Sequence, residues 1–251
     1  MKIYHKNEWV SVNANDDRLK DCNIFIEQDA VIERDAVIGQ SARIEQNAVI
    51  ERGAWIEQNA VIEQDAWIGP DARIEQDARI EQGARIGQSA VIERDAVIGQ
   101  GAVIKQDVVI KQGAVIGQGA VIKRGAVIGQ DAVIERGAWI GQGAVIGQDV
   151  VIERDAWIGQ SAVIEQGAWI ERGAVIERDV WIDTILIYKP GKFRVLLCNN
   201  KIAIGCQLKT AEQWGGDCAD LIDEHEISSD DVEYYRDCIQ KLKPFLSEGI
   251  K

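Results

Sequence analysis

Few residues in this chain could carry acid–base or nucleophilic chemistry at neutral pH. The sequence has two histidines, His5 and His225, and imidazole is the side chain used most often as a general base. Ser41, Ser89 and Ser161 recur at one position of a repeat, but no histidine is close to them in the sequence. Because a serine hydroxyl is a weak nucleophile without an adjacent base, we interpret these serines as turn residues and predict no catalytic residue.

The cysteines do not form a metal-binding motif. Zinc sites draw on closely spaced pairs of cysteine or histidine, and the sequence has no C-x-x-C pair; scattered cysteines with His225 are the weaker alternative. The ligand-rich calcium motif of nonapeptide solenoids is also absent. We therefore expect free, partly buried thiols, and neither a metal nor another cofactor. The five cysteines lie outside the repeat or at its end: Cys22, Cys198, Cys206, Cys218 and Cys238.

Most of the chain is a six-residue repeat that runs from Ile24 to Ile185 without insertion or deletion. Counted from its first residue, usually Ala, the unit has Ile at position 3 in all 27 copies, from Ile26 to Ile182. Position 2 is Val, Trp or Arg, apart from Phe25, and positions 4 to 6 are polar or Gly, apart from Pro70 and Ile185. Side chains alternate along a strand, so positions 1 and 3 face one way and position 2 faces the other.

Each unit predicts a three-residue strand followed by a corner, where Gly, Asn and Asp tolerate the left-handed backbone region. A helix does not fit, because a period of six drifts against about 3.6 residues per turn. A strand this short must stack on copies of itself, which is how a β-solenoid forms. The invariant Ile column then fills the interior, and burying each Ile contributes about 1.5–3 kcal/mol.

The repeat resembles that of the hexapeptide-repeat left-handed parallel β-helices, and the resemblance covers nearly two-thirds of the chain. The segment Ile32-Glu33-Arg34-Asp35-Ala36-Val37 has the family's order of an aliphatic residue, Gly or an acid, two variable residues and a small residue. The resemblance implies an all-β fold, a left-handed triangular β-solenoid with three hexads per coil and about nine coils. At about 4.8 Å per coil the stack is about 43 Å long.

Irregular sequence flanks the repeat on both sides. We expect an N-terminal cap over 1–23, the β-solenoid over 24–185 and a C-terminal cap over 186–251. Within the first cap, the alternation of apolar residues predicts a hairpin over 2–12, and the polar run over 13–23 predicts a loop. Such caps cover the exposed edges of the end coils, so deletion of 186–251 should give a chain that forms fibres.

The C-terminal cap should begin with strands and end with helices. Turn signals at Pro190-Gly191 and Asn199-Asn200 predict an antiparallel meander. A capping box at Thr210 predicts a short helix, Asp217 can begin a second, and apolar residues at helical spacing predict a longer helix from Ser229. The predicted strands are 184–188, 192–198 and 201–206.

With eighteen residues per coil, the outward position-2 side chains form three rows. Every outward Arg lies in the first half of the repeat, so the second half is apolar on all three faces. Exposed apolar strips usually mark an interface, and the resembled family forms trimers, so we expect a homo-oligomer, either a trimer or a dimer. The alternative is that these residues reflect β propensity alone. The interface residues that we single out are Val97, Val115, Val133, Val151, Trp139, Trp157, Trp169 and Trp181.

The composition argues against two classes of partner. Acidic residues exceed basic ones by 41 to 28, for a net charge of −13, whereas nucleic-acid binding needs a clustered basic surface. The sequence has no run of 18 apolar residues, and no signal-peptide core follows Met1. We therefore expect a cytoplasmic protein that binds neither nucleic acid nor membranes.

The resemblance implies acyltransfer, but its usual machinery is missing from the repeat. Acyltransferases of that family use a His as general base and bind the acyl donor with loops that interrupt the coils; the repeat here has neither. The repeated Ile is typical of an idealised or consensus-engineered repeat. We therefore predict a non-enzymatic structural scaffold. Two alternatives stay open, namely an acyltransferase-like protein with its site in a cap, and a self-associating binding module that uses the outward Val and Trp rows.

Overall fold

The computed structural model of the protein describes residues 1–5, 8–11, 16–170, 172–176, 181–182, 186–188, 195–198, 201–204 and 207–209. The chain divides into two compact units, Met1–Trp181 and Ile182–Lys251. The first unit contains the coils, and the second contains a small antiparallel sheet.

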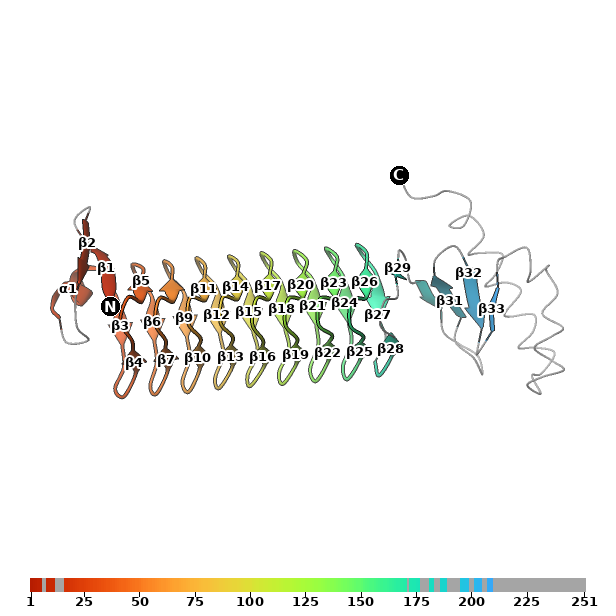
Figure 1. Ribbon diagram of the computed structural model, residues 1–251, viewed down its shortest axis with the longest axis horizontal. Coiled ribbons are helices and arrows are strands. Elements are labelled where there is room, and N and C mark those ends of the chain that lie inside the picture. The colour runs from red at the N-terminus through yellow and green to blue at the C-terminus, as the bar shows by residue number, and fades with distance from the viewer. Residues whose placement is uncertain are drawn as a thin grey trace. The chain divides into compact units, whose positions relative to one another are not determined.

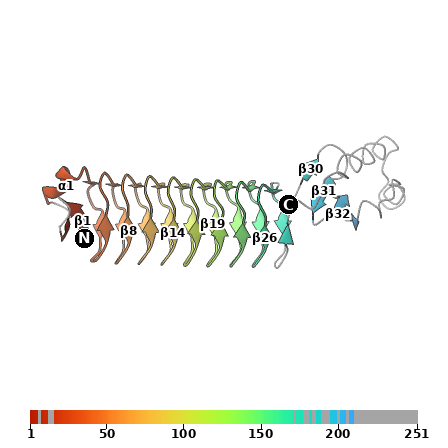
Figure 2. The same cartoon turned by 90° about the horizontal axis from the view of Figure 1, so that it is seen from above.

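Three parallel sheets form the three sides of the coil stack (Figures 1 and 2). Successive strands belong to successive sheets, so each sheet takes every third strand and pairs residues eighteen apart, as in Arg73 with Val91. This topology confirms the predicted left-handed three-sided β-solenoid built from hexapeptide repeats.

The strands repeat every six residues and are two residues long. The first sheet, here called sheet A, contains β5 (Val37–Ile38), β8 (Trp55–Ile56), β11 (Arg73–Ile74), β14 (Val91–Ile92), β17 (Val109–Ile110), β20 (Val127–Ile128), β23 (Val145–Ile146), β26 (Val163–Ile164) and β29 (Trp181–Ile182). Sheet B contains β3 (Phe25–Ile26), β6 (Arg43–Ile44), β9 (Val61–Ile62), β12 (Arg79–Ile80), β15 (Val97–Ile98), β18 (Val115–Ile116), β21 (Val133–Ile134), β24 (Val151–Ile152) and β27 (Trp169–Ile170). Sheet C contains β4 (Val31–Ile32), β7 (Val49–Ile50), β10 (Trp67–Ile68), β13 (Arg85–Ile86), β16 (Val103–Ile104), β19 (Val121–Ile122), β22 (Trp139–Ile140), β25 (Trp157–Ile158) and β28 (Val175–Ile176).

The interior is filled by positions 1 and 3, as predicted. From Ala36 to Ile170, the Ala and Ile side chains at these positions are at most 2% exposed. The strands are shorter than the predicted three residues because the position-1 amide belongs to the corner. Ala78 N, for example, donates to the carbonyl of Glu75 (3.3 Å), whereas the position-2 amide of Arg79 donates to Ala96 in the next coil (2.9 Å).

The corners use two kinds of special backbone. Position 6 has a left-handed backbone, with φ of 62° at Asp35 and 58° at Asn47, which confirms the role predicted for Asp, Asn and Gly there. Where position 4 is Gly, the coils approach closely. A Cβ on Gly117 would lie 2.6 Å from Arg136 N, so only glycine fits that corner without a shift.

The N-terminal segment is a hairpin followed by a short helix. β1 (Lys2–His5) and β2 (Glu8–Ser11) pair antiparallel, which confirms the predicted hairpin. β1 also pairs in parallel with β5, so the hairpin extends sheet A by two strands, β1 and β2. The prediction of a loop over 13–23 is wrong for the described part, because α1 (Arg18–Asp21) forms there and buries Leu19. Residues 12–15 lie outside the described residues.

The second unit contains a four-stranded antiparallel meander in chain order. Its strands are β30 (Leu186–Tyr188), β31 (Val195–Cys198), β32 (Lys201–Ile204) and β33 (Gln207–Lys209). The predicted meander is confirmed, with β33 as an additional strand. The helices predicted from Thr210, Asp217 and Ser229 lie outside the described residues. Within the described residues, no helix has the length and apolar character needed to cross a bilayer.

Candidate functional site

The outward rows are the main chemical feature of the coil surface. Five of the predicted interface residues form one in-register row on sheet B, in which Val115 is 38% and Trp169 52% exposed. The structure does not bring the other three to that row. Trp139 and Trp157 lie on sheet C and Trp181 lies on sheet A. The sheet B row is Val97, Val115, Val133, Val151 and Trp169.

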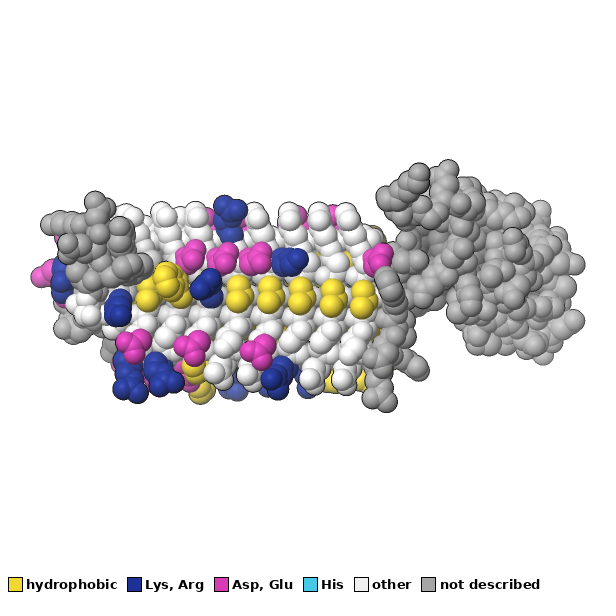
Figure 3. Space-filling view, turned by 45° about the horizontal axis from the view of Figure 1, so that its top comes forward, with side chains coloured by type: hydrophobic (Ala, Val, Ile, Leu, Met, Phe, Trp, Pro, Cys, Tyr) yellow, Lys and Arg dark blue, Asp and Glu magenta, His cyan; other side chains and the backbone are white. Residues whose placement is uncertain are grey.

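Sheet A carries a second apolar strip, which was not among the predicted interface residues. Figure 3 shows it as a straight line of hydrophobic side chains between charged and uncharged corners. The strip could have been recognised in the sequence, because successive members are valines eighteen residues apart. The strip consists of Val91, Val109, Val127, Val145 and Val163.

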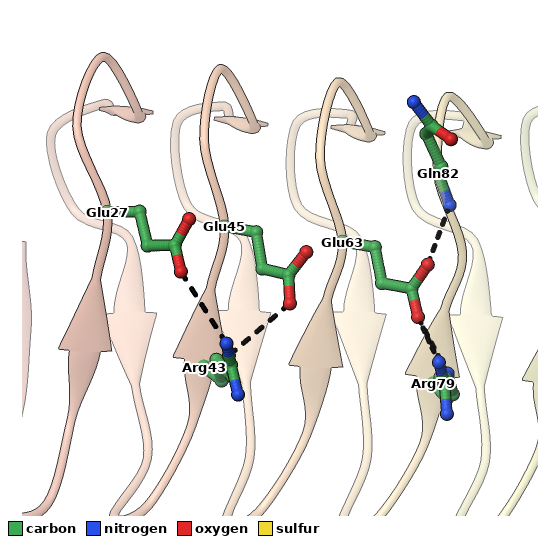
Figure 4. Close-up of polar contacts among 6 residues, drawn as sticks. All are labelled: Glu27, Arg43, Glu45, Glu63, Arg79 and Gln82. Carbon is green, nitrogen blue, oxygen red and sulfur yellow. Dashed lines mark hydrogen bonds and ion pairs between the residues drawn. The ribbon is translucent and has the colours of Figure 1, made fainter.

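Charged side chains bridge neighbouring coils on the first half of sheet B (Figure 4). Arg43 lies 3.6 Å from Glu27 and 3.3 Å from Glu45, and Arg79 Nε donates to Glu63 Oε1 (2.8 Å). The hydrogen bond to Glu63 raises the pKa of Arg79. These pairs are exposed, so each contributes little to stability, about 0–1 kcal/mol. We interpret them as a solvated edge rather than a site.

A polar hollow lies on the corner that follows strands β8, β11, β14 and β17 of sheet A. Its volume is about 310 Å³. Its walls are carboxylates, amides and one guanidinium, so it lacks the apolar lining typical of small-molecule pockets. The hollow is lined by Glu57, Glu75, Gln76, Glu93, Arg94 and Gln112.

The described residues contain no group of three or more His, Cys, Asp or Glu side chains that could hold a metal ion. Cys22 is buried, and burial raises the pKa of its thiol, so the reactive thiolate is disfavoured. The side chain of His5 and the whole of His225 lie outside what the structure describes. The coils therefore hold no acid–base centre built on histidine.

On sheet C, two tryptophan side chains lie next to a lysine. Trp139 and Trp157 are ladder neighbours whose ring centroids lie 5.1 Å apart at an interplanar angle of 35°. Lys123 Nζ lies 4.7 Å from the centroid of the Trp139 ring. On sheet B, Trp169 Nε1 instead donates to Glu153 Oε1 (2.7 Å). The pair on sheet C thus combines an aromatic surface with a cation.

Comparisons with known proteins return hexapeptide-type β-helices. A family model described as the GMPPB C-terminal domain matches residues 54–132, and no curated protein matches the chain. Among solved structures, LpxA from Acinetobacter baumannii is 15% identical, with 90% of this chain and 86% of that chain covered and a TM-score of 0.42. An Arabidopsis UDP-N-acetylglucosamine acyltransferase is 13% identical, with 89% and 93% covered and a TM-score of 0.42.

A UDP-N-acetylglucosamine acyltransferase from Francisella novicida is 19% identical, with a TM-score of 0.32. The match covers 59% of this chain and 60% of that chain, so it spans less than two-thirds of the enzyme. Similarity to solved structures at this level of sequence identity shows a shared fold only. The chain has the left-handed β-helix fold of hexapeptide-repeat proteins, as the sequence resemblance implied.

These comparisons contradict two predictions. The prediction of a non-enzymatic structural scaffold is wrong, because the matched solved structures are acyltransferases. The prediction that the chain is not an enzyme is contradicted by the same finding. Both rested on the lack of histidine and of interrupting loops in the repeat, and on the regularity of its Ile column. That lack concerns only the coils, and a general base can be supplied by residues outside the six-residue period.

Proposed function

We propose that this hexapeptide-repeat β-helix is an acyltransferase-like protein whose acyl-transfer site lies in one of the two segments outside the coils, 1–23 or 186–251. The observation that carries the proposal is the position of the two histidines in the sequence. Residues 24–185 contain no histidine, and His5 and His225 flank them. A general base of the usual kind for acyl transfer therefore comes from one of these two residues.

The proposed reaction needs one base and no metal. The imidazole takes the proton of an acceptor hydroxyl or amine as the acceptor attacks the carbonyl of a thioester. The tetrahedral intermediate then collapses, the carbon–sulfur bond breaks, and the thiol leaves with that proton. The names of the matched enzymes supply a first acceptor to test, UDP-N-acetylglucosamine.

The test is an acyl-transfer assay on the full chain. Release of free thiol from acyl-CoA and from acyl-carrier-protein thioesters is measured with and without UDP-N-acetylglucosamine. We expect acceptor-dependent release that falls about 10²- to 10⁴-fold in either His5→Ala or His225→Ala. Ser89→Ala, a corner residue, is the control and should keep the full rate.

Two outcomes would contradict the proposal. One is the absence of thiol release above the blank for donors of every chain length tested. The other is an unchanged rate in both histidine variants, provided that circular dichroism shows them folded.

A second candidate function is self-association through the sheet B row, as a trimer or a dimer. The supporting observation is the exposure of Val115 and Trp169 within an in-register apolar row. Sedimentation equilibrium tests it with the double variant Val133→Arg, Val151→Arg, because Arg43 and Arg79 already occupy this row in the first half. We expect this variant to be monomeric. The same pair of changes on sheet A, Val127→Arg with Val145→Arg, is the control, and loss of assembly there instead would refute the assignment.

A further inference from the structure

The tryptophan pair on sheet C is built into the register of the stack. Val121, Trp139 and Trp157 are successive ladder partners, so the two indoles lie one coil apart and stack on each other with ring centroids 5.1 Å apart. Trp157 is 44% exposed, and Trp139 is half-buried between its neighbours. Exposed aromatic rings that are fixed in position bind ring-shaped ligands at a low cost in conformational entropy.

At position 4, the corner beside each tryptophan strand carries no side chain. Gly141 and Gly159 follow the tryptophan strands at position 4. A Cβ on Gly141 would lie 2.4 Å from the backbone carbon of Gly159, so packing itself excludes a larger residue there. The edge of the aromatic surface therefore stays open on this side.

Cations occupy the same corner in the two preceding coils. Lys105 and Lys123 are eighteen residues apart, and Lys123 reaches over the Trp139 ring. The one carboxylate between them in the sequence, Asp107, lies 3.4 Å from Arg124. Lysine side chains at this corner therefore give a local positive surface on a chain whose net charge is −13.

The acidic side chains at the corner that precedes the tryptophan strands pair with other residues. Glu135 lies 3.5 Å from Arg154, and Asp155 lies 4.0 Å from Arg172. Glu153 accepts the hydrogen bond from Trp169 (2.7 Å). These contacts reduce the repulsion that an anion would otherwise meet at this surface.

We propose that Trp139, Trp157, Lys105 and Lys123 form a binding site for an acidic oligosaccharide, with a pyranose ring on the exposed Trp157 indole, which Trp139 supports, and carboxylates at the lysines. Trp139 packs between Lys123 of the preceding coil and Trp157 of the following coil, so Trp157 presents the open indole. Lys123 lies two coils, about 10 Å, from Trp157, a distance that a chain of sugar rings spans and a single planar base does not. The charge of the corner selects an anionic sugar over a neutral one. The site is independent of the proposed acyl transfer.

The test is calorimetric titration of the full chain with tetragalacturonate at low ionic strength. We expect saturable binding that weakens as salt is added, because exposed charges are screened over about 10 Å at 0.1 M salt. Maltotetraose, a neutral tetramer, should bind more weakly. Trp157→Val should reduce affinity about tenfold, and Lys123→Gln about fivefold.

Trp67→Val is the matched control, since Trp67 lies on the same sheet with the same 44% exposure but has Val49 and Arg85 as its ladder partners. Valine is the commonest residue at these positions, so both tryptophan variants should fold. The proposal is overturned if tetragalacturonate does not bind, if Trp157→Val and Trp67→Val bind equally well, or if uridine monophosphate binds more tightly than the tetramer.

Discussion

At the scale of single residues, the structure is governed by which positions have room for a Cβ. Inward Ala and Ile follow directly from strand alternation, so this part of the core could be predicted. The close approach at glycine corners could not, because Gly, Glu and Lys alternate at position 4 without a visible rule. The amide of Gly117 donates across coils at 2.6 Å, whereas that of Glu75 donates at 2.9 Å. Glycine thus marks the corners where the coils lie closest together.

Two glycines of one corner should therefore respond differently to substitution. Gly117→Ala places a Cβ 2.6 Å from Arg136 N and should lower the free energy of unfolding by about 1–3 kcal/mol. Gly119 has φ of 65°, and a Cβ added there would meet no atom within 4 Å; Asn47 and Asn59 already occupy equivalent positions. Gly119→Asn should change stability by less than about 0.5 kcal/mol. Urea titration followed by circular dichroism measures both, and equal losses would disprove the distinction.

At the scale of elements, the ends of the stack differ from its middle. A hairpin over 2–12 was predictable from local alternation. Its docking was not, because the pairing of Ile3 with Ile38 joins an irregular segment to the repeat and has no periodic signal. The helix α1 was missed for a related reason: its four residues show no helical period, and burial of Leu19 stabilises it.

β1 should protect the edge of sheet A. The amide of Lys2 donates to the carbonyl of Ala36 (2.7 Å), and Ile3 is fully buried. Deletion of residues 1–11 leaves the backbone acceptors of β5 without this strand, and exposed strand edges promote association. We expect concentration-dependent light scattering from the deletion variant, whereas Lys2→Gln, which keeps the backbone amide, should remain clear. A deletion variant that stays monomeric at high concentration would refute the protective role.

At the scale of the whole molecule, periodicity explains both the success and the failure of prediction. The coils could be predicted because one unit is repeated, and stacking copies of that unit buries a continuous core. The acyl-transfer site could not be predicted in the same way. It needs one general base and the binding surfaces for the acyl donor and the acceptor, and none of these repeats every eighteen residues. The contact between Trp139 and Lys123 could be predicted only in part. Each residue occupies a regular position of the repeat, but the two meet only when the coils are stacked.

The eighteen-residue register underlies every surface described above, and disulfide cross-linking tests it most directly. Gln82 and Gln100 lie one coil apart, with Gln100 Nε2 3.3 Å from Gln82 Oε1. The ladder spacing of about 4.8 Å lies within the Cα separation of disulfides, about 4.4–6.8 Å. We predict that Gln82→Cys with Gln100→Cys cross-links under mild oxidation, and that Gln82→Cys with Arg94→Cys, twelve residues apart, does not. Peptide mapping that finds the 82–94 disulfide, or fails to find the 82–100 disulfide, would contradict the register.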